Sequence, residues 1–228
     1  MSAKIERGHL WSLTKRYKVI REPQFKCVFL VQDEILSALR DFLRGEGFIE
    51  IRGEGFIEIL APIIGPVTDP GIRGAKQVSI DYYGVRFKVM SSMILYKQMA
   101  VASLGKIFAL SPNIRLEPRE SIATRRHLAE FRQVDVEQAY ASYMDVMSVA
   151  ERLIAYVCQR VKKECKGELQ FLNRELKVPK LPFKKLSYQE ALEILREEGF
   201  DVKYGEEISW DAEKALSKMF DEPFFIID

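Results

Sequence analysis

The sequence has few residues of several informative kinds, and each shortage argues against a class of protein. Its three cysteines, Cys27, Cys158 and Cys165, are odd in number and lack metal-ligand spacing, which favours reduced thiols over a disulfide framework. No apolar run approaches the roughly 18 residues of a membrane span, and residues 1–18 lack an apolar core of signal-peptide length. We therefore expect a cytoplasmic protein without a membrane partner.

Net charge is also nearly absent, since 35 basic residues face 33 acidic ones and leave a formal charge of +2. Such a balance provides no overall attraction to nucleic acid or to an anionic membrane, so any charge-based function must be local. The sequence contains neither a G-x-G-x-x-G nor a G-x-x-x-x-G-K-[ST] motif. With 228 residues, 47% of them hydrophobic, the chain is expected to form one large domain rather than two small ones.

Hydrophobic periodicity predicts both helices and strands. Apolar residues recur at helical spacing in five segments: 31–47, 93–105, 142–165, 187–199 and 209–220. Gly105 ends the second of these, and the third opens with Ser142 and Asp145 placed like a capping box. Alternation or short apolar runs predict strands on both sides of Tyr83 and Gly84 within 77–90, and in 107–112, 114–118, 134–141 and 223–228. This order favours an α+β fold on a largely antiparallel sheet flanked by helices.

A tandem octapeptide interrupts this pattern, because residues 44–51 and 52–59 both read "RGEGFIEI". Two units of eight residues cannot form a solenoid, which needs at least three longer repeats. A recent local duplication and an artefact are the two explanations, and the artefact is preferred. Only one copy is expected to be needed, and the second leads directly into "LAPIIGP".

Charged side chains are concentrated between residues 113 and 140, where an average charge run would simply be a solvated hairpin tip. Here Arg115 and Glu117 lie two apart on a predicted strand, and Gln133, Asp135 and Glu137 repeat that spacing on the return strand. Lining one sheet face with such residues is costly unless the face holds a charged ligand. The polar face is therefore a candidate binding site.

Four segments carry a resemblance to a known family. "IRLEP…TRRHLAEFRQVDVE" resembles motif 2 of the class II aminoacyl-tRNA synthetases in the aspartyl and asparaginyl branch, and "GFIEILAP" resembles motif 1, whose proline, here Pro62, lies at the dimer interface. "MSSMILYKQ" is similar to the amino-acid binding segment, and "LSYQEALEILREEGF…PFFIID" to the stretch before the metal-binding strands. The likeness covers residues 31–228 and implies a single class II synthetase-like catalytic domain and a homodimer.

The resemblance implies an ATP site built on motif 2. Arg115 would be the catalytic residue that binds the α-phosphate and the attacking carboxylate, Glu117 would accept from the adenine amino group, and Phe131 would stack on the ring. His127, with an arginine of the loop, Arg125 or Arg126, would reach the terminal phosphates. Gln133 would lie close to both ATP and the amino acid.

The resemblance also implies an amino-acid pocket. Ser92 and Asp135 would hold the substrate ammonium, and Lys97 would meet the side-chain carboxylate of aspartate. A lysine within an apolar helix is otherwise usually a surface residue whose stem covers apolar neighbours. Ile94 stands where the aspartyl branch carries a glutamine, so the handling of the amino acid is expected to differ.

Two parts of the family are missing from the sequence. About 30 residues precede the first predicted helix, too few for the oligonucleotide-binding barrel with which this branch reads an anticodon. The sequence also stops at Asp228, before the Mg²⁺-binding carboxylates and motif 3 of the family, so it reads as an incomplete catalytic domain. ATP and Mg²⁺ are the expected cofactors, with the metal ligands beyond Asp228.

These features lead to three hypotheses for function. The preferred one is a stand-alone paralogue, similar to archaeal ammonia-dependent asparagine synthetases, that activates L-aspartate as an acyl-adenylate and transfers it to ammonia, with tRNA an unlikely partner. Met1 and Ser2 offer no N-terminal cysteine of the kind that glutaminase domains use. The alternatives are the core of an aspartyl- or asparaginyl-tRNA synthetase and an inactive paralogue that serves as a binding module.

Overall fold

The structure is a computed structural model that describes residues 15–45, 55–66, 68, 76–118 and 127–228. The chain divides into two compact units, which we describe separately. One unit comprises residues 40–146, and the other comprises residues 1–39 together with 147–228. Arg125, Arg126 and most of the first octapeptide copy lie outside the described residues.

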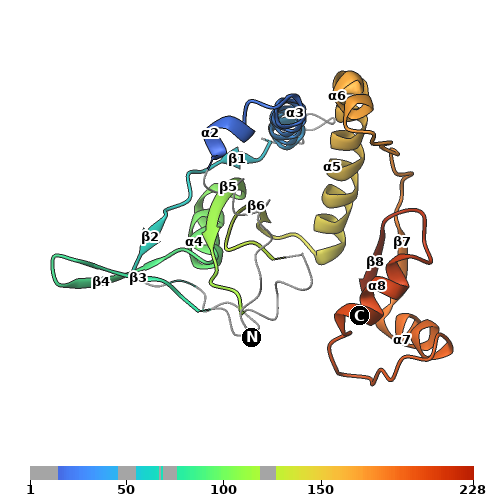
Figure 1. The fold of residues 1–228 in the computed structure, drawn as a ribbon. Helices are drawn as coiled ribbons and strands as arrows, with labels where there is room; N and C mark the ends of the chain where they lie inside the picture. Colours follow the sequence, from blue (N-terminus) through green and yellow to red (C-terminus); the bar gives the residue numbers. More distant parts are fainter. Residues whose placement is uncertain (1–14, 46–54, 67, 69–75, 119–126) are drawn as a thin grey trace, which may run out of the picture. The chain divides into compact units, whose positions relative to one another are not determined.

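The unit of residues 40–146 is built on a three-stranded sheet in the order β1–β5–β6 (Figure 1). Strand β1, Ile57–Glu58, runs parallel to β5, Lys106–Ile114, and β5 pairs antiparallel with β6, Glu130–Gln138. Helix α4, Ile94–Leu104, precedes β5 and ends at Gly105, whose φ of 77° is the left-handed conformation that glycine adopts easily. Ile107 and Phe108 are each 1% exposed, so β5 forms part of the core of this unit.

A second sheet of this unit has the order β2–β4–β3. Its strands are β2, Ile64–Gly65, β3, Ser79–Tyr82, and β4, Val85–Val89. Tyr83 and Gly84 both have positive φ, 51° and 77°, as the two central residues of a tight hairpin turn require. The hairpin predicted around these two residues is confirmed.

The other unit contains most of the two longest helices, α3, Pro23–Gly45, and α5, Tyr143–Glu164. Arg160 of α5 lies 2.8 Å from Glu34 of α3, within an ion pair that joins the two helices. The capping box predicted for α5 is confirmed, because the Ser142 N–H donates to Asp145 Oδ2 at 2.8 Å and the Asp145 N–H donates to Ser142 Oγ at 3.3 Å. The hydroxyl and N–H of Ser142 lower the pKa of Asp145.

The same unit ends in a small α and β substructure. Strands β7, Lys184–Ser187, and β8, Phe224–Ile227, pair in parallel, and helices α7, Tyr188–Glu197, and α8, Trp210–Ser217, lie between them in the sequence. The helices share a core of small and aliphatic residues that are at most 1% exposed: Ala191, Leu195, Ala212 and Leu216. The apolar spacing in 187–199 and 209–220 thus reflects this core.

Several boundaries differ from the sequence-based predictions. Helix α3 begins at Pro23, eight residues before the predicted start, and the short helices α2, Arg16–Val19, and α6, Lys166–Phe171, were not predicted. The predicted strand 114–118 is wrong, since β5 is continuous to Ile114 and Leu116 forms only an isolated bridge to Lys76. None of the helices in the described residues is both long and apolar enough to span a membrane.

Candidate functional site

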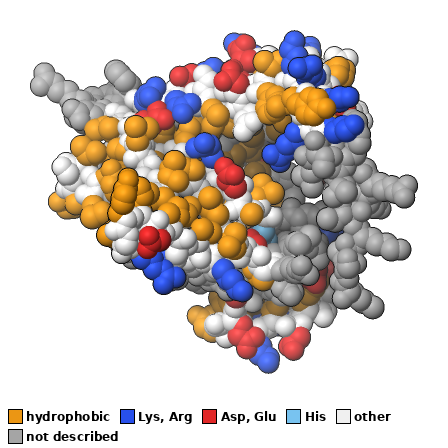
Figure 2. Space-filling model, turned by 60° about the vertical axis from the view of Figure 1, so that its left-hand side comes forward, with side chains coloured by type: hydrophobic (Ala, Val, Ile, Leu, Met, Phe, Trp, Pro, Cys, Tyr) orange, Lys and Arg blue, Asp and Glu red, His pale blue; other side chains and the backbone are white. Residues whose placement is uncertain are grey.

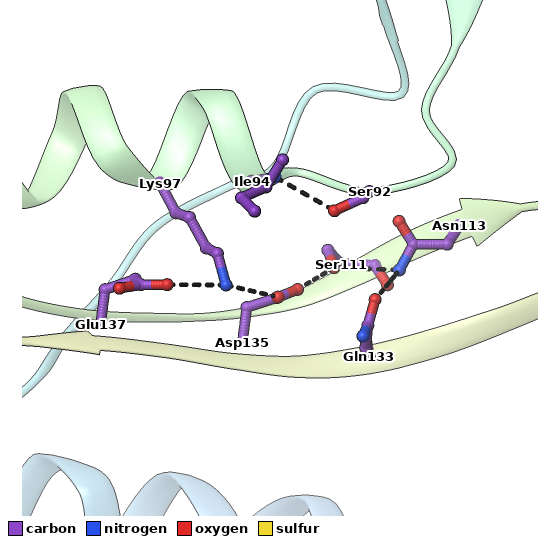
Figure 3. Close-up of polar contacts among 8 residues, drawn as sticks. All are labelled: Ser92, Ile94, Lys97, Ser111, Asn113, Gln133, Asp135 and Glu137. Carbon is purple, nitrogen blue, oxygen red and sulfur yellow. Dashed lines mark hydrogen bonds and ion pairs between the residues drawn. The ribbon is translucent and has the colours of Figure 1, made fainter. Parts of the chain in front are cut away.

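The floor of the candidate site consists of polar side chains on one face of β5 and β6 (Figure 3). The two strands pair in a register that sets Ser111 opposite Gln133, and the side chains two residues apart on each strand share this face. Its members are Ser111, Asn113, Gln133, Asp135 and Glu137. Ser111, Asn113 and Asp135 are 1%, 0% and 8% exposed, so these polar groups need partners within the protein.

Lys97 of α4 extends its side chain toward this floor (Figure 3). Its Nζ lies 2.7 Å from Glu137 Oε1 and 3.4 Å from Asp135 Oδ1, and the lysine side chain is 17% exposed. Burial lowers the pKa of Lys97, but the hydrogen bond to Glu137 and the charges of Glu137 and Asp135 outweigh it and leave the pKa above its usual value. Lys97 is therefore a charged component of the site and not a lysine that extends into solvent.

The remaining floor residues are joined by a chain of hydrogen bonds. The hydroxyl of Ser111 donates to Asp135 Oδ2. Asn113 Nδ2 donates to Gln133 Oε1 at 2.8 Å and lies 3.4 Å from Ser111 Oγ. Asn113 Oδ1 is buried and has no hydrogen-bond partner within the described part of the chain, which is unusual for an amide side chain in a folded protein.

The segment before α4 is held in place by Thr68. Its hydroxyl accepts from the Ser91 N–H at 3.2 Å and donates to the Ser92 carbonyl at 3.1 Å, and Thr68 is itself 5% exposed. Ser92 Oγ accepts from the Ile94 N–H at 3.2 Å, at the start of α4. The segment is thus fixed by buried hydrogen bonds, and Ser92 and Ile94 lie above the polar floor (Figure 3).

A cavity of about 290 Å³ lies in the same unit of the chain, lined by Arg115, Glu117, His127, Leu128 and Phe131. Four of these five residues belong to the predicted ATP site. Its volume is near the lower end of the range of small-molecule pockets, about 300–1,000 Å³. The structure therefore brings together residues that lie up to 16 positions apart in the sequence.

Arg115 occupies a defined position in the cavity. Its Nε donates to the Ser91 carbonyl at 2.9 Å, and its guanidinium carbon lies 5.2 Å from the centre of the Phe131 ring, within cation–π range. The prediction that Arg115 and Glu117 share a strand face is wrong, because the chain turns after Ile114 and the Glu117 N–H donates to the Arg115 carbonyl at 2.9 Å. Both side chains nevertheless line the cavity.

Two predicted residues are not among the members described above, and two residues of the polar floor were not predicted. Arg125 lies outside the described residues, and Pro62 lies between β1 and β2. Ser111 and Asn113 were not assigned to the site, although they continue the spacing of two that ends at Arg115. That alternation, "S-P-N-I-R", was the available signal.

The site residues were also tested for a fit to Mg²⁺, which prefers several oxygen ligands. Within the part of the chain that the structure describes, no group of three or more His, Cys, Asp and Glu could hold a metal ion. Asp135 and Glu137 are both engaged by Lys97, and among the described residues Glu117 alone brings a carboxylate to the cavity lining. The described residues thus supply no ligand set for Mg²⁺.

Comparison with known proteins gives consistent similarities. A family model described as tRNA synthetases class II (D, K and N) matches residues 9–228. The chain is 34% identical over 218 residues to the aspartate–tRNA(Asp/Asn) ligase of Methanopyrus kandleri, covering 95% of this chain and 48% of that protein. It is 32% identical over 217 residues to the asparagine–tRNA ligase of Pyrococcus abyssi, covering 94% and 47% respectively.

Solved structures show the same similarity in three dimensions. The asparaginyl-tRNA synthetase from Pyrococcus horikoshii complexed with asparaginyl-adenylate superposes with a TM-score of 0.82 at 30% identity. The match covers 94% of this chain and 47% of that one. The chain thus spans about half the length of the relatives it matches.

Proposed function

Because the chain belongs to the class II tRNA synthetases of the D, K and N group, we propose that its site binds ATP and aspartate and joins them as an aspartyl-adenylate. The observation that carries this proposal is the presence, in one unit, of the cavity around Arg115 and the buried cluster of Lys97, Asp135 and Glu137. The cavity provides a cation and an aromatic ring for a nucleotide. The cluster provides charges of both signs for an amino acid.

The nucleotide would be held by the residues that line the cavity. Phe131 offers a ring on which adenine can stack, and Glu117 can accept a hydrogen bond from the adenine amino group. Arg115 is planar and can bridge the α-phosphate and a carboxylate. His127, with Arg125, would contact the terminal phosphates.

Aspartate has one ammonium and two carboxylates, and the buried cluster offers charges of both signs for the ammonium and one carboxylate, while Arg115 is left for the other. Lys97, Asp135 and Glu137 together carry one surplus negative charge, which a bound ammonium group would neutralise. We assign Asp135 and Ser92 to that ammonium. We assign Lys97 to the carboxylate that does not react, since its ammonium group is held near the floor by two acidic partners.

The reaction requires positioning and charge neutralisation from these residues. A carboxylate oxygen of aspartate attacks the α-phosphorus, the new C–O–P linkage forms, and the bond from the α-phosphorus to the bridging oxygen breaks as pyrophosphate leaves. Negative charge on the phosphoryl oxygens is stabilised by Arg115. Loss of one such donor costs about 3 to 4 kcal/mol in the transition state, so Arg115 should dominate catalysis.

Two acceptors fit the resulting adenylate. The relatives are named as tRNA ligases, which supports activation of the α-carboxylate and transfer to tRNA. The position of Ile94 supports a second candidate, the activation of the β-carboxylate and its transfer to ammonia to give asparagine. Ile94 lies above the polar floor beside Ser92 (Figure 3), and an apolar side chain there removes the amide that the aspartyl branch would place near the substrate.

Hydroxylamine trapping tests the activity and separates the two acceptors. Incubation with ATP, Mg²⁺, L-aspartate and hydroxylamine should give an aspartyl hydroxamate and pyrophosphate. The β-hydroxamate supports asparagine synthesis and the α-hydroxamate supports a tRNA ligase. If the full-length protein gives neither product, the proposed activity is wrong and an inactive binding module becomes the better explanation.

We also propose that the chain forms a homodimer through the region around Pro62. Leu60, Ile63 and Ile64 flank this proline and are 90%, 62% and 43% exposed, which is unusual for a run of aliphatic residues in a monomer. In Figure 2 the side of Figure 1 that carries β2, β3 and β4 comes forward, and hydrophobic side chains gather over that face. A second copy of the chain would remove this apolar surface from water.

A further inference from the structure

In the polar floor, the donor and the acceptor of each hydrogen bond follow one from another, beginning at the Asp135 carboxylate. The ionised carboxylate of Asp135 can only accept hydrogen bonds, and it accepts from both Lys97 and Ser111. The single hydroxyl hydrogen of Ser111 is therefore used in donating to Asp135 Oδ2. Ser111 Oγ can then only accept a hydrogen bond from its other neighbour. That neighbour is the side-chain amide of Asn113.

This requirement determines which end of the Asn113 amide faces Ser111. Its Nδ2 lies 3.4 Å from Ser111 Oγ and 3.5 Å from the Ser111 carbonyl oxygen, and a carbonyl oxygen is always an acceptor. Both contacts are long, but an amide oxygen in the position of Nδ2 would face two acceptors and could donate to neither. Asn113 therefore presents its NH₂ group to Ser111.

The orientation of Asn113 in turn determines that of Gln133. Asn113 Nδ2 donates to Gln133 Oε1 at 2.8 Å, so the oxygen of the Gln133 amide is used within the protein and its NH₂ group is left for another partner. This arrangement leaves Asn113 Oδ1 buried without a hydrogen-bond partner among the described residues. Buried polar groups in folded proteins normally have a partner, and a role in orienting a ligand-binding side chain would account for this exception.

Gln133 also lies between the two parts of the proposed site. On β6 it shares a face with Phe131, which lines the cavity, and with Asp135, which belongs to the amino-acid cluster. The reacting carboxylate and the α-phosphate must meet between these parts. Both groups present anionic oxygens, which accept hydrogen bonds and do not donate them.

We propose that Asn113 is a positioning residue that holds Gln133 with its Nε2 toward the substrates, so that Gln133 donates to an anionic oxygen of the reacting groups. This inference rests on the proposed function for the identity of the substrates, but the orientation of the amide does not depend on it. The oxygen could belong to the amino-acid carboxylate or to the α-phosphate. Separate additions of L-aspartate and of AMP distinguish these sources.

Side-chain amide NMR measures the orientation in the free protein, whether or not the protein is active. In a ¹⁵N-labelled sample, the NH₂ protons of Asn113 should exchange slowly with water and those of Gln133 rapidly, with assignments from the single variants Asn113→Asp and Gln133→Glu. The Gln133 resonance should shift when the ligand that it contacts is added. Slow exchange at Gln133 in the free protein, or no shift with either ligand, would overturn the proposal.

Asn113→Asp tests the consequence for binding. The new carboxylate can only accept, so the Gln133 amide should rotate and present its oxygen to the substrates, and the KM of the affected substrate should rise about tenfold or more at neutral pH. Asn173→Asp makes the same change at an exposed position and should leave KM unchanged. An unchanged KM in a folded Asn113→Asp protein would contradict the proposal.

The pH profile separates positioning from a merely structural role. When the carboxyl of Asp in Asn113→Asp is protonated, its O–H can again donate to Gln133 Oε1, so the ratio of variant to parent KM should fall as the pH is lowered. Lys97 of α4 and Asp135 and Glu137 of β6 are present in both proteins, so their titration cancels in the ratio. A ratio that does not change with pH would indicate a structural role only.

Gln133→Glu keeps the test available if Asn113→Asp fails to fold. A glutamate can still accept from Asn113 Nδ2, but it presents a carboxylate oxygen to the substrates in place of an NH₂ group. Binding should weaken about tenfold or more with an unchanged melting temperature. Binding equal to that of the parent would refute the proposed donor, whereas an absence of activity in the parent itself would refute only the proposed function.

Discussion

The buried ion cluster of Lys97, Asp135 and Glu137 permits a quantitative test of how the site is held together. Lys97→Met keeps the length of the side chain and removes its charge, which leaves two neighbouring carboxylates without a cation. Removing one partner of a fully buried pair costs about 3 to 5 kcal/mol. Glu137 is 31% exposed and water can replace part of its lost contact, so we expect a loss of about 2 to 3 kcal/mol.

This loss can be measured by thermal unfolding followed by circular dichroism. For a chain of this size, 1 kcal/mol corresponds to about 2 to 4 °C, so Lys97→Met should lower the melting temperature by about 4 to 12 °C. The matched control is Lys163→Met, because Lys163 pairs with Glu164 at 3.0 Å but the two side chains are 76% and 45% exposed. That control should change stability by less than about 0.5 kcal/mol.

The effect of Lys97→Met should also depend on pH. The parent has a Lys97 pKa above its ordinary value of 10.5, so the stabilisation by its charge is fully present at neutral pH and is lost as the pH rises through the folded-state pKa. In the variant this stabilising charge is absent at every pH. The stability difference should therefore be fully present near neutral pH and shrink as the pH rises through the pKa of Lys97 in the parent; equal losses in Lys97→Met and Lys163→Met would refute a buried, charged Lys97.

Three further predictions concern the nucleotide, the dimer and the tandem octapeptide. Arg115→Ala should abolish aspartate-dependent pyrophosphate exchange while the circular dichroism spectrum stays unchanged, and Phe131→Ala should weaken ATP binding by roughly 1 to 3 kcal/mol in a titration; normal exchange or affinity would contradict these roles. Light scattering at micromolar concentration should give a dimer mass for the parent and a monomer mass for Leu60→Glu, and a monomeric parent would count against the interface. Deletion of residues 46–53 should change the free energy of unfolding by no more than about 1 kcal/mol, whereas Phe56→Ala in that background should cost about 3 kcal/mol or more.

Local patterns were sufficient to predict much of the fold. The hairpin around Tyr83 and Gly84, helix α4 with its end at Gly105, and the capping box at Ser142 and Asp145 all depend on residues close in sequence. The resemblance in motif 2 also brought Arg115, Glu117, His127 and Phe131 into one proposed site, and all four line one cavity. Each of these predictions uses a short-range rule or a continuous motif.

The β6 half of the polar floor was predicted from its spacing, but the β5 half was not, because it depends on how far β5 continues beside β6. The sequence pattern predicted two strands, 107–112 and 114–118, yet a single strand β5 runs through Pro112 and Asn113 to Ile114. Proline lacks an N–H, but β1 pairs only with Ile107 and Phe108, so Pro112 lies beyond the part of β5 that has a strand on both sides. Ser111 and Asn113 become site residues only once this continuous strand sets them beside Asp135 and Gln133.

The second copy of the tandem octapeptide is held by contacts with residues outside that copy. In the second copy, the Phe56 N–H donates to the Leu43 carbonyl near the end of α3, Phe56 is 3% exposed, and Glu58 pairs with Arg40 and Arg44. Composition and propensity cannot select this copy, because the residues of the other are the same. What distinguishes it is the connection to "LAPIIGP", which continues the chain from β1 toward β2. The contacts that place β1 thus come from α3 and from the connection that follows, which no prediction from the eight residues alone contains.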